Sequence, residues 1–231
     1  MITDEPLLSF DNVAYQYPGG IKALKNISFF LKEKERVVIL GRNGSGKSTM
    51  LLLSAALLKP TEGNVNVAGV DTASKDIIEI RRKVGMVFQN ADDQLFMPSV
   101  FDDVAFGPRN MGLSHNEVSS RVESALKTTG TYDLMKRRPY ELSGGQKKLV
   151  SIATVLSMEP KLLLLDEPTA GLDYEGERNF IEVIQALPHA FLLSTHDLTL
   201  ARKLCNRAIV LDDGVVKFDG PIENVHYPPT I

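Results

Sequence analysis

The stretch VVILGRNGSGKST, Val37 to Thr49, joins an apolar run to a glycine-rich loop. The spacing G-x-x-x-x-G-K-[ST] is met by Gly41, Gly46, Lys47 and Ser48. Glycines let backbone N–H groups turn toward an anion, and the start of a following helix adds further donors and partial positive charge. A chance match in a chain of this length has a probability on the order of 1%. The stretch therefore predicts a strand, a phosphate-binding loop and a helix.

The composition limits the number of domains, the partners and the disulfides that this chain can be expected to have. The chain has 231 residues, 43% of them hydrophobic, which is enough for one domain or for one domain with a smaller lobe. A net charge of -3 gives no general attraction to nucleic acid, and the short basic clusters at 81–83 and 136–138 are expected to be solvated faces. The single cysteine, Cys205, allows no intrachain disulfide.

Membrane insertion is not expected. The start MITDEP lacks the apolar core of a signal peptide. No apolar run approaches the roughly 20 residues that span a bilayer. Any membrane role is therefore expected to be peripheral.

The order of predicted elements favours an α/β fold. Residues 7–20 and 24–31 are expected to form antiparallel strands, and 35–40, 83–89, 161–167 and 190–195 to form buried strands. Helices are expected at 47–58, after a capping box at Ser114 to Glu117, after 142–146 and around 180–187, and a hairpin should turn at Asp213-Gly214. We expect a P-loop core with a mainly parallel sheet, an N-terminal antiparallel β subdomain and an inserted α-helical subdomain. The chain is interpreted as one domain, 1–231, with the helical part at roughly 90–158.

The stretch LLLLDEP, Leu162 to Pro168, reads as a buried strand that ends in two acids. Asp166 could hold the hydration shell of Mg²⁺, and Glu167 could polarise an attacking water. The alternative is a strand that simply runs into an acidic turn. The glycine loop upstream favours the catalytic interpretation.

The stretch LSGGQKK, Leu142 to Lys148, places a serine and two glycines at a helix start. This is a second candidate anion site, far in sequence from the first. A head-to-tail dimer could use both, because each chain would complete the site of the other. An ordinary glycine N-cap remains the alternative.

Two polar residues stand at strand ends, Gln89 after KVGMVF and His196 after LLST. A lone glutamine or histidine is more often structural than catalytic. Ligands gather at the carboxyl ends of strands in open α/β sheets, which favours a role in the site.

Taken together, these motifs resemble the nucleotide-binding subunit of an ATP-binding cassette transporter, from Phe10 to about Gly220. The resemblance implies ATP hydrolysis with Glu167, His196 and Gln89 as catalytic residues and Asp173 at the dimer interface. It implies Mg²⁺ held by Ser48, Gln89 and Asp166. The implied ATP-binding residues are Tyr17, Gly41, Arg42, Asn43, Gly44, Ser45, Gly46, Lys47, Ser48, Thr49, Ser143, Gly144, Gly145 and Gln146.

A narrower resemblance covers Phe88 to Ser114, which is similar to the ATPase subunits of energy-coupling-factor importers, including the cobalt and nickel type. It implies import of vitamins or transition-metal ions, at the cytoplasmic face of the cell membrane. Arg42 and Ala91 stand where this family more usually has proline, and Leu149 where it often has arginine. None of these differences removes a catalytic group.

The resemblance also implies partners: integral membrane subunits and a second ATPase subunit, identical or a paralogue, but no nucleic acid. A partner helix is expected to dock near Leu95, Phe96 and Met97, unless these residues belong to the core. The alternatives are an ATPase of another transporter or a soluble DNA-repair-like ATPase. The latter usually has a long coiled coil, and about a hundred residues without sustained heptads separate Lys47 from Ser143.

Overall fold

The computed structural model describes residues 5–74 and 77–225. The first four residues of the MITDEP start lie outside the described residues. The chain divides into two compact units. Of the described residues, the sheet unit comprises 5–74, 77–84, 161–166 and 188–225, and the helical unit comprises Gly85–Pro160 and Glu167–Leu187.

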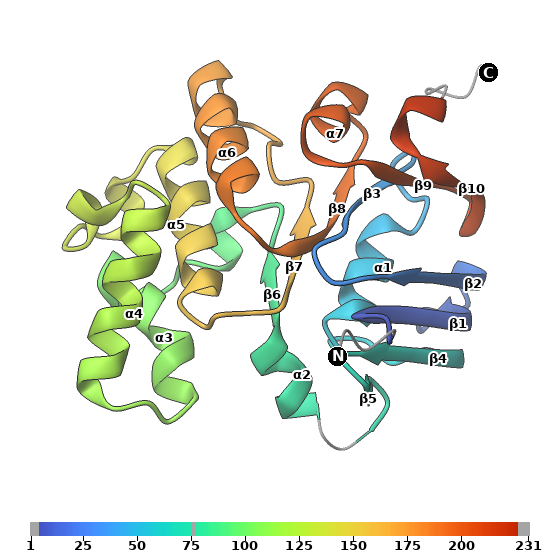
Figure 1. Ribbon diagram of the computed structural model, residues 1–231, viewed down its shortest axis with the longest axis horizontal. Coiled ribbons are helices and arrows are strands. Elements are labelled where there is room, and N and C mark those ends of the chain that lie inside the picture. Colours follow the sequence, from blue (N-terminus) through green and yellow to red (C-terminus); the bar gives the residue numbers. More distant parts are fainter. Residues whose placement is uncertain (1–4, 75–76, 226–231) are drawn as a thin grey trace. The chain divides into compact units, whose positions relative to one another are not determined.

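An antiparallel sheet opens the sheet unit, with strand order β2-β1-β4-β5. Its strands are β1 (Leu8–Gln16), β2 (Lys22–Leu31), β4 (Glu62–Val67) and β5 (Val70–Asp71). Phe10 pairs with Phe29 across β1 and β2, and their rings stack with centroids 4.7 Å apart on the buried face. Figure 1 shows these strands in blue and teal. The predicted antiparallel subdomain is confirmed.

The second sheet of this unit is mainly parallel. Its strands lie in the order β10-β9-β3-β8-β7. Their bounds are β3 (Arg36–Leu40), β7 (Leu162–Asp166), β8 (Ala190–Thr195), β9 (Arg207–Asp212) and β10 (Val215–Pro221). β3 is parallel to both β8 and β9, and β7 is parallel to β8. β6 (Val84–Val87) crosses from the sheet unit into the helical unit.

Strand register decides which residues meet at the edge of this sheet. Leu40 is opposite Thr195, and Asp166 is opposite Ser194. The carboxyl ends of β3, β7 and β8 therefore lie at one edge, where ligands collect in folds of this class. The phosphate-loop candidate begins at that edge, directly after Leu40.

The helices of the sheet unit are short: α1 (Lys47–Ser54), α2 (Ile77–Lys83), α7 (Leu198–Leu204) and the 3₁₀ turn η4 (Ile222–Asn224). The first was predicted to reach Leu58 but ends at Ser54, because Ala56 takes a left-handed φ of 52°. Neither α2 nor β5 was predicted. With seven residues, α2 is too short for a helical apolar period to be recognised in the sequence.

The helical unit contains α3 (Val100–Asn110), α4 (His115–Thr128), α5 (Gly144–Leu156) and α6 (Tyr174–Ala186). Three 3₁₀ turns connect them: η1 (Ala91–Asp93), η2 (Tyr132–Leu134) and η3 (Pro139–Glu141). Residues from α3, α4 and α5 share one apolar core that includes Val104, Val122 and Val150, and these helices lie side by side in Figure 1. The capping box at Ser114 and Glu117 is confirmed.

Candidate nucleotide site

The loop from Gly41 to Thr49 lies between β3 and α1 and requires glycine at two positions. Gly46 has a φ of 107°, and a Cβ there would come within 2.7 Å of the Ala23 carbonyl oxygen. A Cβ on Gly41 would collide with the Leu211 carbonyl oxygen. Larger residues would therefore force the loop away from the strands that support it.

Polar groups in this loop are arranged to receive an anion. Lys47 Nζ donates to the carbonyl oxygens of Gly41 at 2.9 Å and Arg42 at 3.3 Å. The buried Ser45 Oγ has no hydrogen-bond partner among the described residues. α1 begins at a glycine, Gly46, with no side-chain cap, so its first N–H groups face the loop without a capping oxygen. Ordered phosphate oxygens would satisfy these donors.

The remaining loop residues differ in exposure. Arg42, Asn43, Gly44 and Ser48 are exposed, and Thr49 is buried. Tyr17 follows β1, and its hydroxyl lies 3.1 Å from Thr49 Oγ1. Its ring meets Tyr15 edge to face, with centroids 4.8 Å apart. The structure therefore brings Tyr17 to the helix that follows the loop.

Three oxygens converge where β7 and β8 end. Ser48 Oγ donates to Asp166 Oδ1 at 3.1 Å, and Ser194 Oγ donates to the same atom at 2.5 Å. Hydroxyl and carboxylate oxygens are hard ligands of the kind that Mg²⁺ prefers, so this set fits that ion. Sequence reasoning missed Ser194. The sequence signal that could have indicated it is a small polar residue, Ser194, within the otherwise apolar strand β8.

His196 follows β8 directly and is exposed. Asp197 caps α7 by accepting from the Thr199 N–H at 2.7 Å, which fixes the chain just after the histidine. His196 therefore lies at the same sheet edge as Asp166.

The helical unit holds the other predicted site residues. Gln89 is exposed, two residues after β6 ends. Ser143 caps α5: its Oγ accepts from the Gln146 N–H at 3.3 Å, and its own N–H donates to Gln146 Oε1 at 3.0 Å. A Cβ on Gly144 would meet nothing within 4 Å. The first turn of α5 is therefore capped but open on one side.

The starts of α5 and α6 pack closely. A Cβ on Gly145 would lie 3.1 Å from Gly176 Cα, and Asp173 Oδ1 accepts from the Gly176 N–H at 2.8 Å. A cavity of about 250 Å³ opens here, lined by Ser143, Gly145, Gln146, Leu149, Asp173, Glu175, Gly176 and Asn179. The LSGGQ segment and Asp173 therefore share one concave surface.

Glu167 has a left-handed backbone with a φ of 39°. This conformation is uncommon for a residue with a side chain and is typical of functional sites. Its carbonyl oxygen accepts from the Ala170 N–H at 3.1 Å, so a turn follows at once. The side chain is partly exposed.

The predicted residues thus fall into two sets. The sheet unit brings together Tyr17, the loop, Asp166 and His196, and the helical unit carries Gln89, the LSGGQ motif, Glu167 and Asp173. Each set is polar and lies at strand or helix ends.

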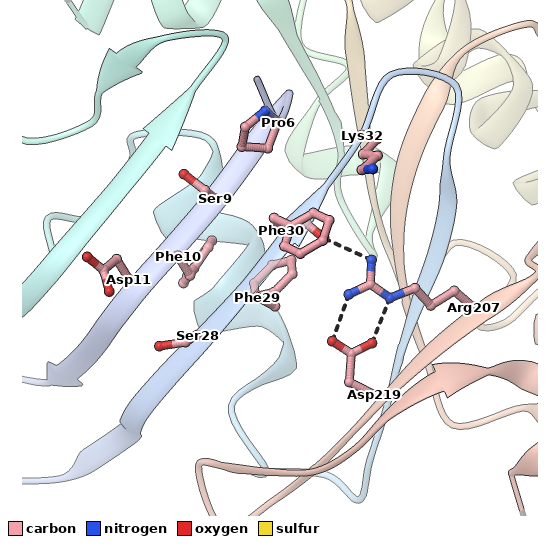
Figure 2. A pocket seen from close by; sticks show the side chains of 10 residues that line it. All are labelled: Pro6, Ser9, Phe10, Asp11, Ser28, Phe29, Phe30, Lys32, Arg207 and Asp219. Atoms are coloured by element: carbon pink, nitrogen blue, oxygen red, sulfur yellow. Dashed lines mark hydrogen bonds and ion pairs between the residues drawn. The ribbon is translucent and has the colours of Figure 1, made fainter. Parts of the chain in front are cut away.

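A larger cavity of about 660 Å³ lies elsewhere in the sheet unit (Figure 2). Arg207, at the start of β9, lies beside it, whereas Leu211 near the end of that strand contacts the loop. Arg207 donates to both Asp219 carboxylate oxygens at 2.6 and 2.7 Å, to the Phe30 carbonyl oxygen and to Glu35. Hydrogen bonding to Asp219 raises the pKa of Arg207. We interpret the bond to the Phe30 carbonyl oxygen as satisfying a backbone group of β2, the edge strand of the antiparallel sheet.

Comparison with known proteins decides the family. The family model described as ABC transporter matches residues 24–170. The chain belongs to the ABC transporter family. It is therefore an ATP-binding, ATP-hydrolysing subunit of a transporter. Among the described residues, no helix combines the length and apolar character needed to cross a membrane.

Relatives in this ABC family cover most of the chain. The energy-coupling factor transporter ATP-binding protein EcfA1 of Methanospirillum hungatei is 42% identical over 97% of this chain and 83% of its own length. The structure of cbiO1 from Clostridium perfringens, described as part of the ABC transporter complex cbiONQ, has a TM-score of 0.86 at 39% identity and covers 95% of this chain and 90% of that one. The ATP-binding cassette MJ0796, a dimer bound to ADP and phosphate, has a TM-score of 0.83 at 33% identity, covering 94% of this chain and 100% of that one.

Proposed function

We propose that this ABC subunit powers an energy-coupling-factor type importer of vitamins or transition-metal ions such as cobalt or nickel. The names of EcfA1 and cbiO1 and the resemblance over Phe88 to Ser114 support this assignment. The chain then acts as one nucleotide-binding domain with its helical part inserted in the α/β core. The observation that carries the ATPase assignment is the glycine-dependent loop beside the contact of Ser48 with Asp166.

In this proposal the phosphates of ATP occupy the loop from Gly41 to Thr49. Lys47 exchanges its carbonyl contacts for β- and γ-phosphate oxygens, and the Tyr17 ring stacks on adenine. Ser48, Asp166 and Gln89 would hold Mg²⁺, directly or through water. When bound, the ion neutralises charge that develops on the phosphate oxygens.

Hydrolysis needs a base and donors placed around the γ-phosphate. Glu167 accepts the proton of the water that attacks the γ-phosphorus, and ADP leaves. His196 donates to the γ-phosphate. Ser143 to Gln146 of a second subunit, identical or a paralogue, complete the site in a head-to-tail dimer. The dimeric state of MJ0796, bound to ADP and phosphate, supports the pairing of two subunits.

Partner docking is expected near the turn after Gln89. Leu95 belongs to the core, but Phe96 is 62% exposed and meets the 44% exposed Phe106 edge to face at 5.1 Å. Asp103 Oδ1 accepts from the Phe96 and Met97 N–H groups, both at 3.0 Å. A ring held in place while exposed suits docking of an apolar helix from a membrane subunit, with this chain peripheral at the cytoplasmic face.

The test is co-purification of tagged Glu167→Gln with ATP from native membranes, followed by mass spectrometry. We expect a multispanning membrane protein together with a substrate-binding membrane subunit. Phe96→Glu should lose both, whereas Tyr140→Glu, a change at an exposed aromatic of η3, should keep them.

Other outcomes distinguish the alternatives. Membrane partners without a substrate-binding subunit would indicate an ATPase of another transporter class. Soluble or nucleic-acid-bound partners alone would overturn the transport assignment. Unchanged binding by Phe96→Glu would overturn the docking site.

A further inference from the structure

Lys148 is a buried lysine near the start of α5. It is only 2% exposed, although its side chain carries a charge. Its Nζ donates to the carbonyl oxygens of Phe88 at 2.8 Å and Gln89 at 2.7 Å. Burial of an ammonium group is costly unless such bonds compensate, so the choice of lysine here calls for a specific reason.

The two carbonyl acceptors belong to successive peptide groups. One peptide group precedes the Cα atom of Gln89 and the other follows it. Because peptide groups are planar, holding both of them fixes the direction of the Gln89 Cα–Cβ bond. Lys148 therefore fixes the direction in which the exposed Gln89 side chain leaves the backbone.

A second contact fastens the same segment to α5. Gln94 Nε2 donates to the Ser151 carbonyl oxygen at 2.9 Å and to Thr154 Oγ1 at 2.7 Å. Gln94 Oε1 accepts from the Phe88 N–H at 3.3 Å. Lys148, Ser151 and Thr154 follow each other at helical spacing, so one face of α5 holds the segment from Phe88 to Gln94.

The neighbouring lysine behaves differently. Lys147 pairs with Asp92 at 2.7 Å, and the Asp92 side chain is 62% exposed. The Lys147 side chain is 20% exposed, so this pair is only partly open to solvent. Lys147 is bonded to neither of the two carbonyl oxygens that Lys148 holds, so it serves as a control that contacts the same segment without fixing the peptide groups on both sides of Gln89.

We propose that Lys148 is a positioning residue: it aims Gln89 for catalysis and ties that glutamine to the helix that carries the LSGGQ motif. This inference rests on the proposed role of Gln89 in the nucleotide site. Movement of α5 would then reach the backbone of Gln89 through the buried Lys148 side chain, beside the contacts that Gln94 makes. Lysine is suited to this contact because it can bond two carbonyl oxygens at once.

The test is a double-mutant cycle on steady-state ATP hydrolysis by the purified full chain. Gln89→Ala and Lys148→Met are each expected to lower kcat about 10-fold with KM changed less than about threefold. The double variant should be no more than about threefold below Gln89→Ala, because both changes act on one group. Lys147→Met, which removes only the contact with Asp92, should lower kcat less than Lys148→Met does.

Rescue separates positioning from folding. Lys148→Arg keeps the charge and several donors, so it should lose less kcat than Lys148→Met. If Lys148→Met does not fold, Lys148→Gln, which keeps one donor pair, replaces it in the cycle. Thermal unfolding of every variant shows that folded protein is compared.

Two results would overturn the inference in different ways. Multiplied losses of about 100-fold in the double variant would show that Lys148 acts independently of Gln89 and would reject the positioning role alone. A Gln89→Ala variant with unchanged kcat would instead reject the catalytic role of Gln89 in the proposed function.

Discussion

The helices α1 and α5 both start at glycine-rich motifs, but their N-termini are capped differently. α1 begins at Gly46 without a side-chain cap, whereas Ser143 and Gln146 close a complete capping box on α5. The uncapped helix keeps its donors for a ligand, and the capped helix uses part of them internally. The Ser143 bond is long, at 3.3 Å, so an incoming phosphate could replace it at little cost. Under the proposed function, the start of α1 would bind an anion in the single subunit, and the start of α5 would do so only on dimerisation.

The glycines of the two motifs differ in the same way. Gly46 is crowded by the Ala23 carbonyl oxygen, and Gly144 has open space around it. In α1 the glycine is needed to build the loop. In α5 it leaves room, which suits the approach of another molecule.

The largest effect that this comparison predicts is on Lys47. Lys47→Ala should raise the Kd for MgATP about 10- to 100-fold, because it removes charge-assisted bonds to the phosphates. Titration with a fluorescent ATP analogue measures this change. Ser143→Ala in the monomer should leave the Kd within about twofold, and an equal loss in both variants would contradict the distinction between the two helix starts.

The second prediction concerns the two glycines. Gly46→Ala should lower the free energy of unfolding by about 1–3 kcal/mol, because a side chain is strained at its φ of 107°. Gly144→Ala should change it by less than about 0.5 kcal/mol. Urea unfolding without nucleotide measures both. Similar losses at the two positions would show that the crowding around Gly46 is not decisive.

The third prediction compares the stability effects of removing one serine from each motif, Ser143 and Ser45. Ser143→Ala removes the cap of α5 and should cost about 1 kcal/mol of unfolding free energy. Ser45→Ala removes a buried hydroxyl without a described partner and should be neutral or slightly stabilising without ATP. The same urea series measures these effects, and a clear loss for Ser45→Ala would show that its hydroxyl is satisfied in the free protein.

The smallest predicted effect depends on pH. Burial raises the pKa of Asp103 above 3.8, so the folded chain holds a proton that the unfolded chain releases. Stability should therefore fall as pH rises from the unfolded pKa through the raised one, and should change no further above it. Asp103→Asn should remove this part of the slope. Equal slopes of the unfolding free energy in both proteins would reject the raised pKa.

Much of the architecture follows from local signals. The apolar runs before Gly41 and Asp166 are long enough to predict buried strands. The pair Ser114 and Glu117 predicts the start of a helix. The end of α1 and the short α2 were not predictable, since a left-handed Ala56 and a helix with a single buried residue depend on tertiary packing.

The candidate site shows the same limit. The loop glycines and the two acids that follow β7 could be predicted because each motif consists of residues that are adjacent in the sequence. Ser194 lies beside Asp166 because the parallel strands β7 and β8 pair in that register. Lys148 bonds to the Gln89 carbonyl oxygen although the two residues are 59 positions apart in the sequence. Contacts of that kind arise from the fold, so a pattern along one chain does not contain them.

The most direct test of the account compares binding and turnover in Glu167→Gln. We predict a Kd for MgATP within about threefold of the wild type and a kcat at least about 100-fold lower, because only the group that accepts the proton from water is lost. Wild-type turnover in this variant would contradict the assignment of Glu167 as the group that accepts the proton from water.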